Sequence, residues 1–185
     1  MILIKKIFAP LMLFFISILT ACNGIQNANK LNNVSINPQD IVLFFLDSLQ
    51  HKDMVKVIKI NDKSDTVKLK NADWIKEMDF LEAINTNKPA YKGTLQLDTT
   101  RNADTLIYHL TCNDKKLNLK EASIFYFKDQ LLHMHLKSFS NNFLYSNAKE
   151  IYFNPLKGYC VKGFQKLDLI SNKEVAYTIL VNKSS

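Results

Sequence analysis

The sequence predicts an α+β domain in which two helices pack on one face of an antiparallel meander sheet of six to eight strands. Two segments between residues 37 and 84 repeat their apolar residues with the helical period. From Tyr91 onward the apolar period changes to two, which is the period of strands that bury one face. The connections between these strands are short, and short connections favour antiparallel neighbours over crossovers.

The first helix is expected to begin at Asn37-Pro38, because Asn is a favoured N-cap and Pro fits the first helical position. It is expected to end near His51-Lys52. Leu43 and Phe44 widen its apolar face, so the helix should be largely buried; the rest of that face is Ile41, Val42, Phe45, Leu46 and Leu49. A second helix is expected over residues 73–84, with an apolar face formed by Trp74, Ile75, Met78, Leu81 and Ile84.

Between the two helices, Met54–Ile60 and Thr66–Lys70 are expected to form a hairpin around the turn Asn61–Asp65. A sheet with many strands tends to curl, so a half-open barrel with the helices at its mouth is a natural elaboration. The alternating patterns predict further strands at Leu95–Leu97, Leu106–Cys112, Leu117–Phe127, Leu131–Phe139, Lys149–Phe153, Gly158–Lys166 and Val175–Val181.

The N-terminal residues have the pattern of a secretory signal peptide. Lys5 and Lys6 precede the apolar run Ile7–Leu19, and small residues follow that run. As a helix this run would extend about 20 Å, which is short of the roughly 30 Å hydrocarbon core of a bilayer. Residues 1–21 are therefore interpreted as a signal peptide rather than as a transmembrane anchor.

The end of this segment, Leu19-Thr20-Ala21-Cys22, resembles the lipobox of bacterial lipoproteins. The resemblance implies that signal peptidase II cuts before Cys22, that the Cys22 thiol carries diacylglycerol, and that the new amine is acylated, for example with palmitate. Two or more acyl chains hold a protein firmly on a membrane, whereas one does so only marginally. The expected organisation is a signal peptide at 1–21, a lipidated cysteine and flexible tether at 22–37, and one globular domain at 38–185.

The charge and the tether suggest where the protein lies and what it does not bind. No acidic residue follows Cys22 before Asp40, and the acidic signal that sends some bacterial lipoproteins to the cell surface is thus missing. We therefore expect the periplasmic side of a membrane. The formal charge is +7, but Arg101 is the only arginine among 24 basic residues. Because sites that read nucleic-acid bases favour arginine, no nucleic-acid partner is expected.

Three histidines form the most metal-like feature of the sequence. His133 and His135 are two residues apart on a predicted strand and would share a face, and His109 on another strand could supply a third ligand. The alternative is a solvent-facing pair of histidines, which we favour because the chain lacks a ligand-spacing pattern. No cofactor is expected. Ser146 and Lys149 match a Ser-x-x-Lys pattern, but the partner motifs of penicillin-binding enzymes are absent.

After lipidation of Cys22, two cysteines remain, Cys112 and Cys160. An even number of cysteines in an oxidising compartment makes a disulfide possible. Two separate buried thiols are the alternative, because the distance between the cysteines cannot be read from the sequence.

The leading functional hypothesis is a lipid-anchored cell-envelope protein that is a non-enzymatic binding or interaction module. Its membrane contact is the N-terminal lipid, and its partner would be an envelope protein or a hydrophobic ligand. The alternative is a small periplasmic metal-dependent or hydrolytic enzyme that uses His109, His133 and His135. A solid domain without a pocket would instead favour interaction through its surface.

Overall fold

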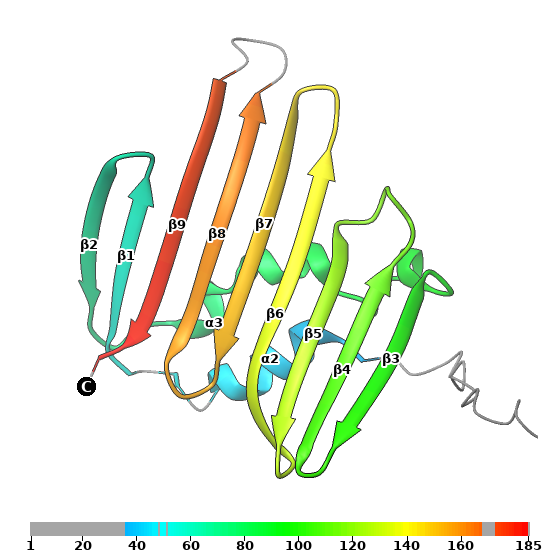
Figure 1. Ribbon diagram of the computed structural model, residues 1–185. Coiled ribbons are helices and arrows are strands. Elements are labelled where there is room, and N and C mark those ends of the chain that lie inside the picture. Colours follow the sequence, from blue (N-terminus) through cyan, green and yellow to red (C-terminus); the bar gives the residue numbers. More distant parts are fainter. Residues whose placement is uncertain (1–35, 48, 51, 168–172, 185) are drawn as a thin grey trace, which may run out of the picture. The chain divides into compact units, whose positions relative to one another are not determined.

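The computed structural model describes residues 36–47, 49–50, 52–167 and 173–184 (Figure 1). The predicted signal peptide at 1–21, the lipidation site Cys22 and tether residues 23–35 lie outside these described residues. None of the helices in the described part of the chain combines the length and the apolar character needed to cross a membrane.

The described residues form a mostly β structure with a small helical layer. Its helical segments are α2 (Pro38–Asp47), α3 (Trp74–Glu77) and the 3₁₀ segments η1 (Asp79–Ile84) and η2 (Pro89–Tyr91). Its strands are β1 (Met54–Ile60), β2 (Lys63–Leu69), β3 (Leu95–Asn102), β4 (Thr105–Cys112), β5 (Leu119–Phe127), β6 (Gln130–Asn141), β7 (Tyr145–Asn154), β8 (Gly158–Leu167) and β9 (Lys173–Lys183).

All of these strands belong to one antiparallel sheet in the order β2-β1-β9-β8-β7-β6-β5-β4-β3. The prediction of an antiparallel meander is confirmed, whereas the expected six to eight strands were too few, since the sheet has nine. The sheet is not closed, because β2 and β3 each pair with one neighbour only. The α+β class with two helices is matched only in part, since strands dominate.

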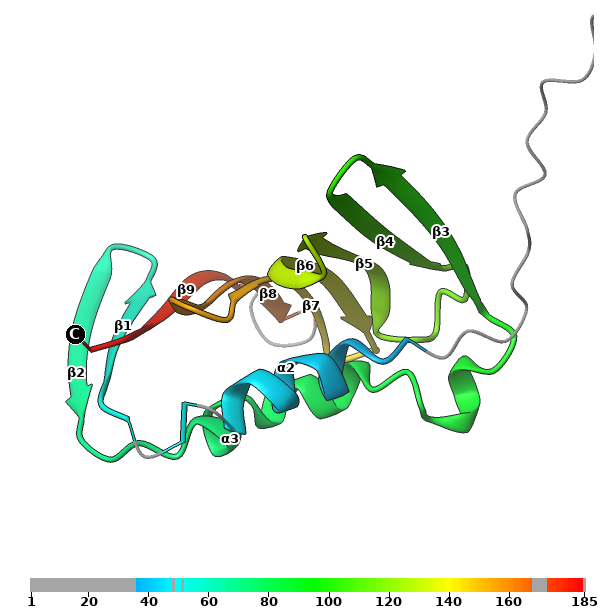
Figure 2. The same ribbon diagram turned by 90° about the horizontal axis from the view of Figure 1, so that it is seen from below.

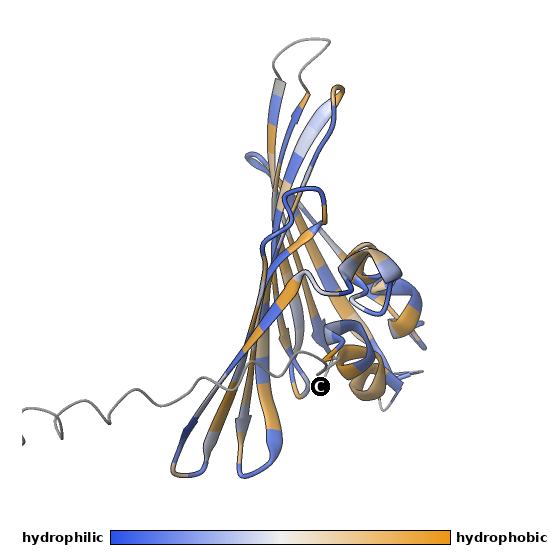
Figure 3. Ribbon diagram, turned by 90° about the vertical axis from the view of Figure 1, so that its right-hand side faces the viewer, coloured by the Kyte–Doolittle hydropathy of each residue, from blue (hydrophilic) through white to orange (hydrophobic). Residues whose placement is uncertain are grey.

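The order of the strands places the first strand of the domain, β1, next to its last strand, β9. β9 lies between β1 and β8, so the β1–β2 hairpin pairs with the last strand rather than with β3. The chain from β2 to β3 therefore crosses the whole sheet, and it does so through α3, η1 and η2 (Figure 2). α2 lies on the same side of the sheet (Figures 2 and 3).

The expected second helix is broken at Met78. The hydroxyl of Tyr159 on β8 donates to the Glu77 carbonyl oxygen at 3.3 Å, which is the acceptor that Leu81 would use in a continuous α-helix. The Leu81 amide donates instead to the Met78 carbonyl at 2.9 Å, and the chain continues as the 3₁₀ segment η1. Contact with the sheet therefore overrides the helical period of the sequence.

The first helix also differs from its prediction. α2 ends at Asp47 rather than near His51, and Phe44 is 75% exposed, although it was expected to widen the buried face. Val42 and Leu46 are the fully buried residues of this helix. Phe44 contacts Phe45 edge to face, with the ring centroids 5.3 Å apart.

The core lies between the helical layer and one face of the sheet, which we call the covered face; the other is the open face. Alternation along β7 shows the division, because Ile151 and Phe153 are buried on the covered face and Tyr152 is on the open face. The fully buried residues of the covered face include Leu110, Leu119, Ile124, Met134, Leu136, Ile151, Phe153 and Val181, and those of the helical layer include Val42, Leu46, Trp74 and Leu81.

Candidate functional site

Strands β6 to β9 extend past the helical layer at one end of the sheet (Figures 1 and 3). Along these strands, the positions that face the core change from apolar to mainly polar residues. Cross-strand pairing places them side by side on the covered face. We call this set the distal patch: Ser138, Asn147, Lys149, Gly163, Gln165 and Tyr177.

Lys149 lies at the centre of the distal patch in the register of Ile151 and Phe153. Its side chain is half-buried, and burial alone lowers the pKa of its ammonium group. Within the described part of the chain, Lys149 has no hydrogen-bond or ion-pair partner. A half-buried cation without a counter-ion lowers the free energy of unfolding. Lys149 therefore destabilises the folded domain when no ligand is bound.

Asn147 is the neighbour of Lys149 on the same face of β7, two residues along the strand. Its Oδ1 is buried and accepts no hydrogen bond from any group in the described residues. Across the sheet, Asn147 pairs with Ser140 on β6 and Gln165 on β8. Among the described residues, the distal patch thus holds a cation, Lys149, without a protein partner and a buried acceptor, the Asn147 Oδ1, without a donor.

Gly163 lies directly across the strand pair from Lys149, and Tyr177 lies across from Gly163. A Cβ built on Gly163 would overlap the ring of Tyr177, so this ring occupies the space above the glycine. The absence of a side chain at Gly163 allows the Tyr177 ring to lean toward Lys149. An aromatic surface therefore borders the unpaired lysine.

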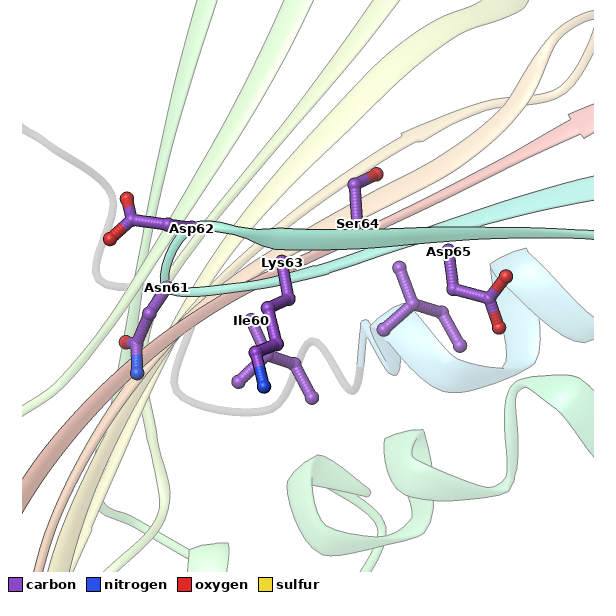
Figure 4. A pocket seen from close by; sticks show the side chains of 7 residues that line it. Ile60, Asn61, Asp62, Lys63, Ser64 and Asp65 are labelled. Atoms are coloured by element: carbon purple, nitrogen blue, oxygen red, sulfur yellow. The ribbon is translucent and has the colours of Figure 1, made fainter.

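The row of the distal patch continues to the tip of the β1–β2 hairpin, since Tyr177 pairs with Ile60 and Ile60 with Lys63. A pocket of about 630 Å³ lies at this tip, with Ile58, Ile60, Lys63 and Asp65 among its lining residues. Figure 4 shows Ile60, Lys63 and Asp65 on the side of the hairpin that faces the helices, whereas Ser64 points away. The pocket thus lies at the edge of the distal patch.

The three candidate metal ligands lie on the open face instead. His133 stacks on Phe125 with ring centroids 4.2 Å apart, and His135 stacks on Tyr152 at 4.3 Å. His109 is two strands from His135, or about 10 Å across the sheet. Among the described residues, no group of three or more His, Cys, Asp or Glu side chains is arranged to hold a metal ion. The structure does not bring the three histidines into one ligand set.

His109 and Ser123 are the pair that comes nearest to a hydrolytic arrangement. Nδ1 of His109 lies 2.9 Å from Oγ of Ser123, and Asp98 is paired with His109 across β3 and β4. Acyl transfer also requires donors that stabilise an oxyanion. Ser123 lies on an interior strand whose backbone is paired on both sides, with β4 and with β6, so its amides are engaged in the sheet. The pair is better explained as a cross-strand hydrogen bond.

The two cysteines of the domain are free thiols that the structure keeps apart. Cys112 is buried on the covered face of β4, whereas Cys160 pairs with Tyr152 and lies on the open face of β8. Four strand spacings of about 4.8 Å separate β4 from β8. A disulfide needs Cα atoms within about 7 Å, so of the two alternatives left open by the sequence the structure has the separate thiols.

Sequence reasoning did not single out the distal patch, although a signal was present. In the strand Tyr145–Asn154, Asn147 and Lys149 fall in the same alternation phase as Ile151 and Phe153. A polar residue in the buried phase of a strand is unfavourable unless it has a function. Ser146, the partner of Lys149 in the Ser-x-x-Lys match, lies in the opposite phase and therefore on the other face of the sheet.

Comparison of the chain with protein-family models, with curated proteins and with solved structures found no match. The functional conclusion therefore rests on the chain's own residues.

Proposed function

We propose that the protein is a lipid-anchored binding module of the bacterial cell envelope, that it faces the periplasm, and that it performs no catalysis. In this proposal the lipids on Cys22 hold the domain at a membrane, and residues 23–35 act as a tether, since Ile36 and Asn37 already belong to the folded domain. The distal patch is the binding surface, and its ligand or partner is a component of the envelope.

The anchor is supported by the lipobox-like sequence Leu19-Thr20-Ala21-Cys22 directly after a charged and then apolar segment. A tether of about thirteen residues spans roughly 20 Å, which is enough to hold a folded domain clear of the lipid headgroups. The positive charge of the chain is consistent with this location, because lysines near a membrane are attracted to anionic headgroups.

One observation carries the binding role: the distal patch places polar side chains in the core-facing register, and two of them lack a protein partner among the described residues. Lys149 has no counter-ion, and the Asn147 Oδ1 has no donor, in the part of the chain described. Natural proteins keep such unfavourable polar groups mainly where a ligand uses them. The side chains of the distal patch provide hydrogen-bonding groups and an aromatic ring, and small-molecule binding sites combine groups of these two kinds.

The anchor is tested by changing Cys22 to Ser and following radiolabelled palmitate and membrane fractionation in the producing bacterium. We expect the wild-type protein to incorporate palmitate and to sediment with membranes. The C22S variant should lose the label, because the thioether cannot form, and should accumulate as the uncleaved precursor.

The matched control is Cys160→Ser, which removes a free thiol of the folded domain and leaves the lipobox intact. This control should keep both the label and the membrane association. Palmitate incorporation that persists in C22S, or that disappears in C160S, would contradict the proposed anchor.

A further inference from the structure

The six residues of the distal patch carry a positive charge and no negative one. Lys149 is its charged residue, and the six residues that define the patch include no acidic side chain. Lys63 lies in the same cross-strand row, at the border of the pocket, where Asp62 and Asp65 also line the pocket, so Lys149 remains the cation of the row that has no acidic neighbour in the patch. The acidic residues Glu150 and Glu174 on the same strands alternate to the open face, away from this row.

A ligand that stabilises the distal patch must supply partners for two groups, the Lys149 ammonium and the Asn147 Oδ1. Lys149 offers three N–H donors and needs an anionic acceptor. The unsatisfied Asn147 Oδ1 needs a donor, and Asn147 lies two residues from Lys149 on one strand face, or about 6.6 Å away. A simple inorganic anion meets only the first requirement. A small organic molecule with a carboxylate and a hydroxyl or amide N–H meets both.

The region around the two polar groups favours an organic ligand over a naked ion. The ring of Tyr177 lies over Gly163 beside Lys149, and Ile58 and Ile60 line the adjoining pocket. Aromatic and aliphatic surface next to a few polar groups is the usual composition of a small-molecule site. Partial burial strengthens an ion pair formed there, because the surroundings screen it less than bulk water does.

From this geometry we propose that the distal patch binds an organic carboxylate that also carries hydroxyl or amide donors. The Lys149 ammonium binds the carboxylate, the Asn147 Oδ1 accepts from the hydroxyl or amide, and Tyr177 packs against the carbon skeleton. This assignment deepens the proposed binding function and rests on it, but it does not depend on the lipid anchor.

The test measures thermal unfolding of the full chain in a neutral detergent at constant ionic strength. The probes are glucuronate and N-acetylalanine, which each combine a carboxylate with hydroxyl or amide donors. Their matched controls are glucose and N-acetylalanine amide, which lack the carboxylate, together with potassium chloride and inorganic phosphate. At least one of the two carboxylates should raise the unfolding temperature in a concentration-dependent way, because ligands that bind only the folded state stabilise it.

The variant Lys149→Met keeps the length of the side chain and removes the charge. Without a probe, K149M should unfold about 2–4 °C above the wild type, because the desolvated and unpaired charge is gone. With the carboxylate probes it should show no further rise. The matched control Lys59→Met removes an exposed lysine from the open face of β1 and should retain the response to the probes.

The proposal is overturned if neither carboxylate stabilises the wild type, if the neutral analogues, chloride or phosphate do so equally, or if K149M responds like the wild type. A lower unfolding temperature of K149M without probe would give Lys149 a structural role and also contradict the proposal. If K149M does not fold, Lys149→Gln replaces it in the same comparison. Because the assay does not involve the lipids, a negative result leaves the palmitate-labelling result for Cys22 intact, and the two proposals fail separately.

Discussion

On the open face, His135 is partly buried, stacks on an aromatic ring and lies near charged side chains. Its ring lies nearly parallel to that of Tyr152, and its Nε2 is buried without a hydrogen-bond partner in the described residues. Burial lowers the pKa of His135; Lys137 and His133 lower it further, whereas Glu150 and Glu121 oppose the shift. The folded protein therefore disfavours the imidazolium form.

We predict that this histidine makes the protein less stable in mild acid. Since the pKa of His135 is lower in the folded state, the unfolded chain takes up a proton first, and the free energy of unfolding falls as pH drops below about 6.5. Replacing His135 with Phe keeps a stacked ring and removes the titration. Urea unfolding between about pH 7.5 and pH 5 should show a smaller loss in H135F than in the wild type.

The control for this comparison is His133→Phe, which also replaces a stacked histidine on β6 but leaves His135 in place. It should keep most of the wild-type pH dependence. An H135F protein that loses stability in acid as steeply as the wild type would show that other groups cause the effect.

Two glycines with positive φ provide a second prediction at the scale of single residues. Gly158, the first residue of β8, has φ +127°, and a Cβ on it would overlap the Val181 carbonyl oxygen on β9. Gly93 has φ +76°, and a Cβ there would have no neighbour within 4 Å. Gly93→Ala should cost about 1 kcal/mol through backbone strain alone, and Gly158→Ala at least about 3 kcal/mol. Equal losses in chemical denaturation would mean that the close approach to β9 is not rigid.

At the scale of elements, one asparagine joins the start of α2 to the end of η1. The Asn37 Oδ1 accepts from the Gln39 amide at 3.3 Å, as expected of an N-cap, and also from the Thr86 amide and hydroxyl at 3.2 Å. Its Nδ2 donates to the Asn85 Oδ1 at 3.3 Å. Asn37 is buried, and it ties together two segments that are almost fifty residues apart.

We predict that Asn37→Ala destabilises the domain by about 2 kcal/mol or more, because it removes the cap and leaves the buried Thr86 amide without an acceptor, whereas the Thr86 hydroxyl keeps the Ile36 carbonyl. Asn85→Ala removes exposed bonds to Asn87 and Glu82 and one bond to Asn37, but it keeps the cap and the Thr86 contacts and should cost less. Equilibrium unfolding in urea measures both. Equal and small losses would show that water replaces these contacts at no cost.

The elements differ in how far the sequence predicts them. The sequence predicted β1 at its observed bounds, and it predicted β4 and β8 with an error of one residue at one end. Alternation of polar and apolar residues is a local signal, and a half-buried strand preserves it. Of the Asn37 contacts, the sequence indicated only the N-cap bond. The break of the second helix at Met78 depends on Tyr159, which is more than eighty residues further along the chain. Such contacts follow from the fold and are invisible to local periodicity.

For the molecule as a whole, the decisive feature is that the first strand pair joins the last strand. β9 holds the β1–β2 hairpin to the rest of the sheet, and Val181 on β9 is fully buried in the core. No local pattern indicates this pairing, because β1 and β9 are separated by more than a hundred residues. For the same reason the sequence could not decide how far apart Cys112 and Cys160 would lie.

We predict that a chain ending after Leu167 does not fold cooperatively. It would lack β9, which leaves the β1–β2 hairpin without its partner strand and removes the fully buried Val181 from the core. Far-UV circular dichroism should show no cooperative thermal transition. A sharp transition in this shortened chain would mean that β3 to β8 and the helices form an independent unit.

The distal patch, too, emerges only when the whole sheet is assembled. Lys149, Gly163 and Tyr177 lie on three successive strands of the sheet, and their order along one row depends on the register of each pair. The sequence shows the polar residues in the buried phase, but only the structure shows that the strands that carry them extend past the helical layer (Figure 3).

The measurement that tests the proposed anchored module most directly is mass spectrometry of the N-terminal peptide of the protein purified from bacterial membranes. The peptide should begin at Cys22 and carry the mass of diacylglycerol, together with an acyl chain on its amine. A peptide that retains residues before Cys22, or that begins at Cys22 with an unmodified thiol, would contradict the lipid anchor and with it the proposed place of the protein in the envelope.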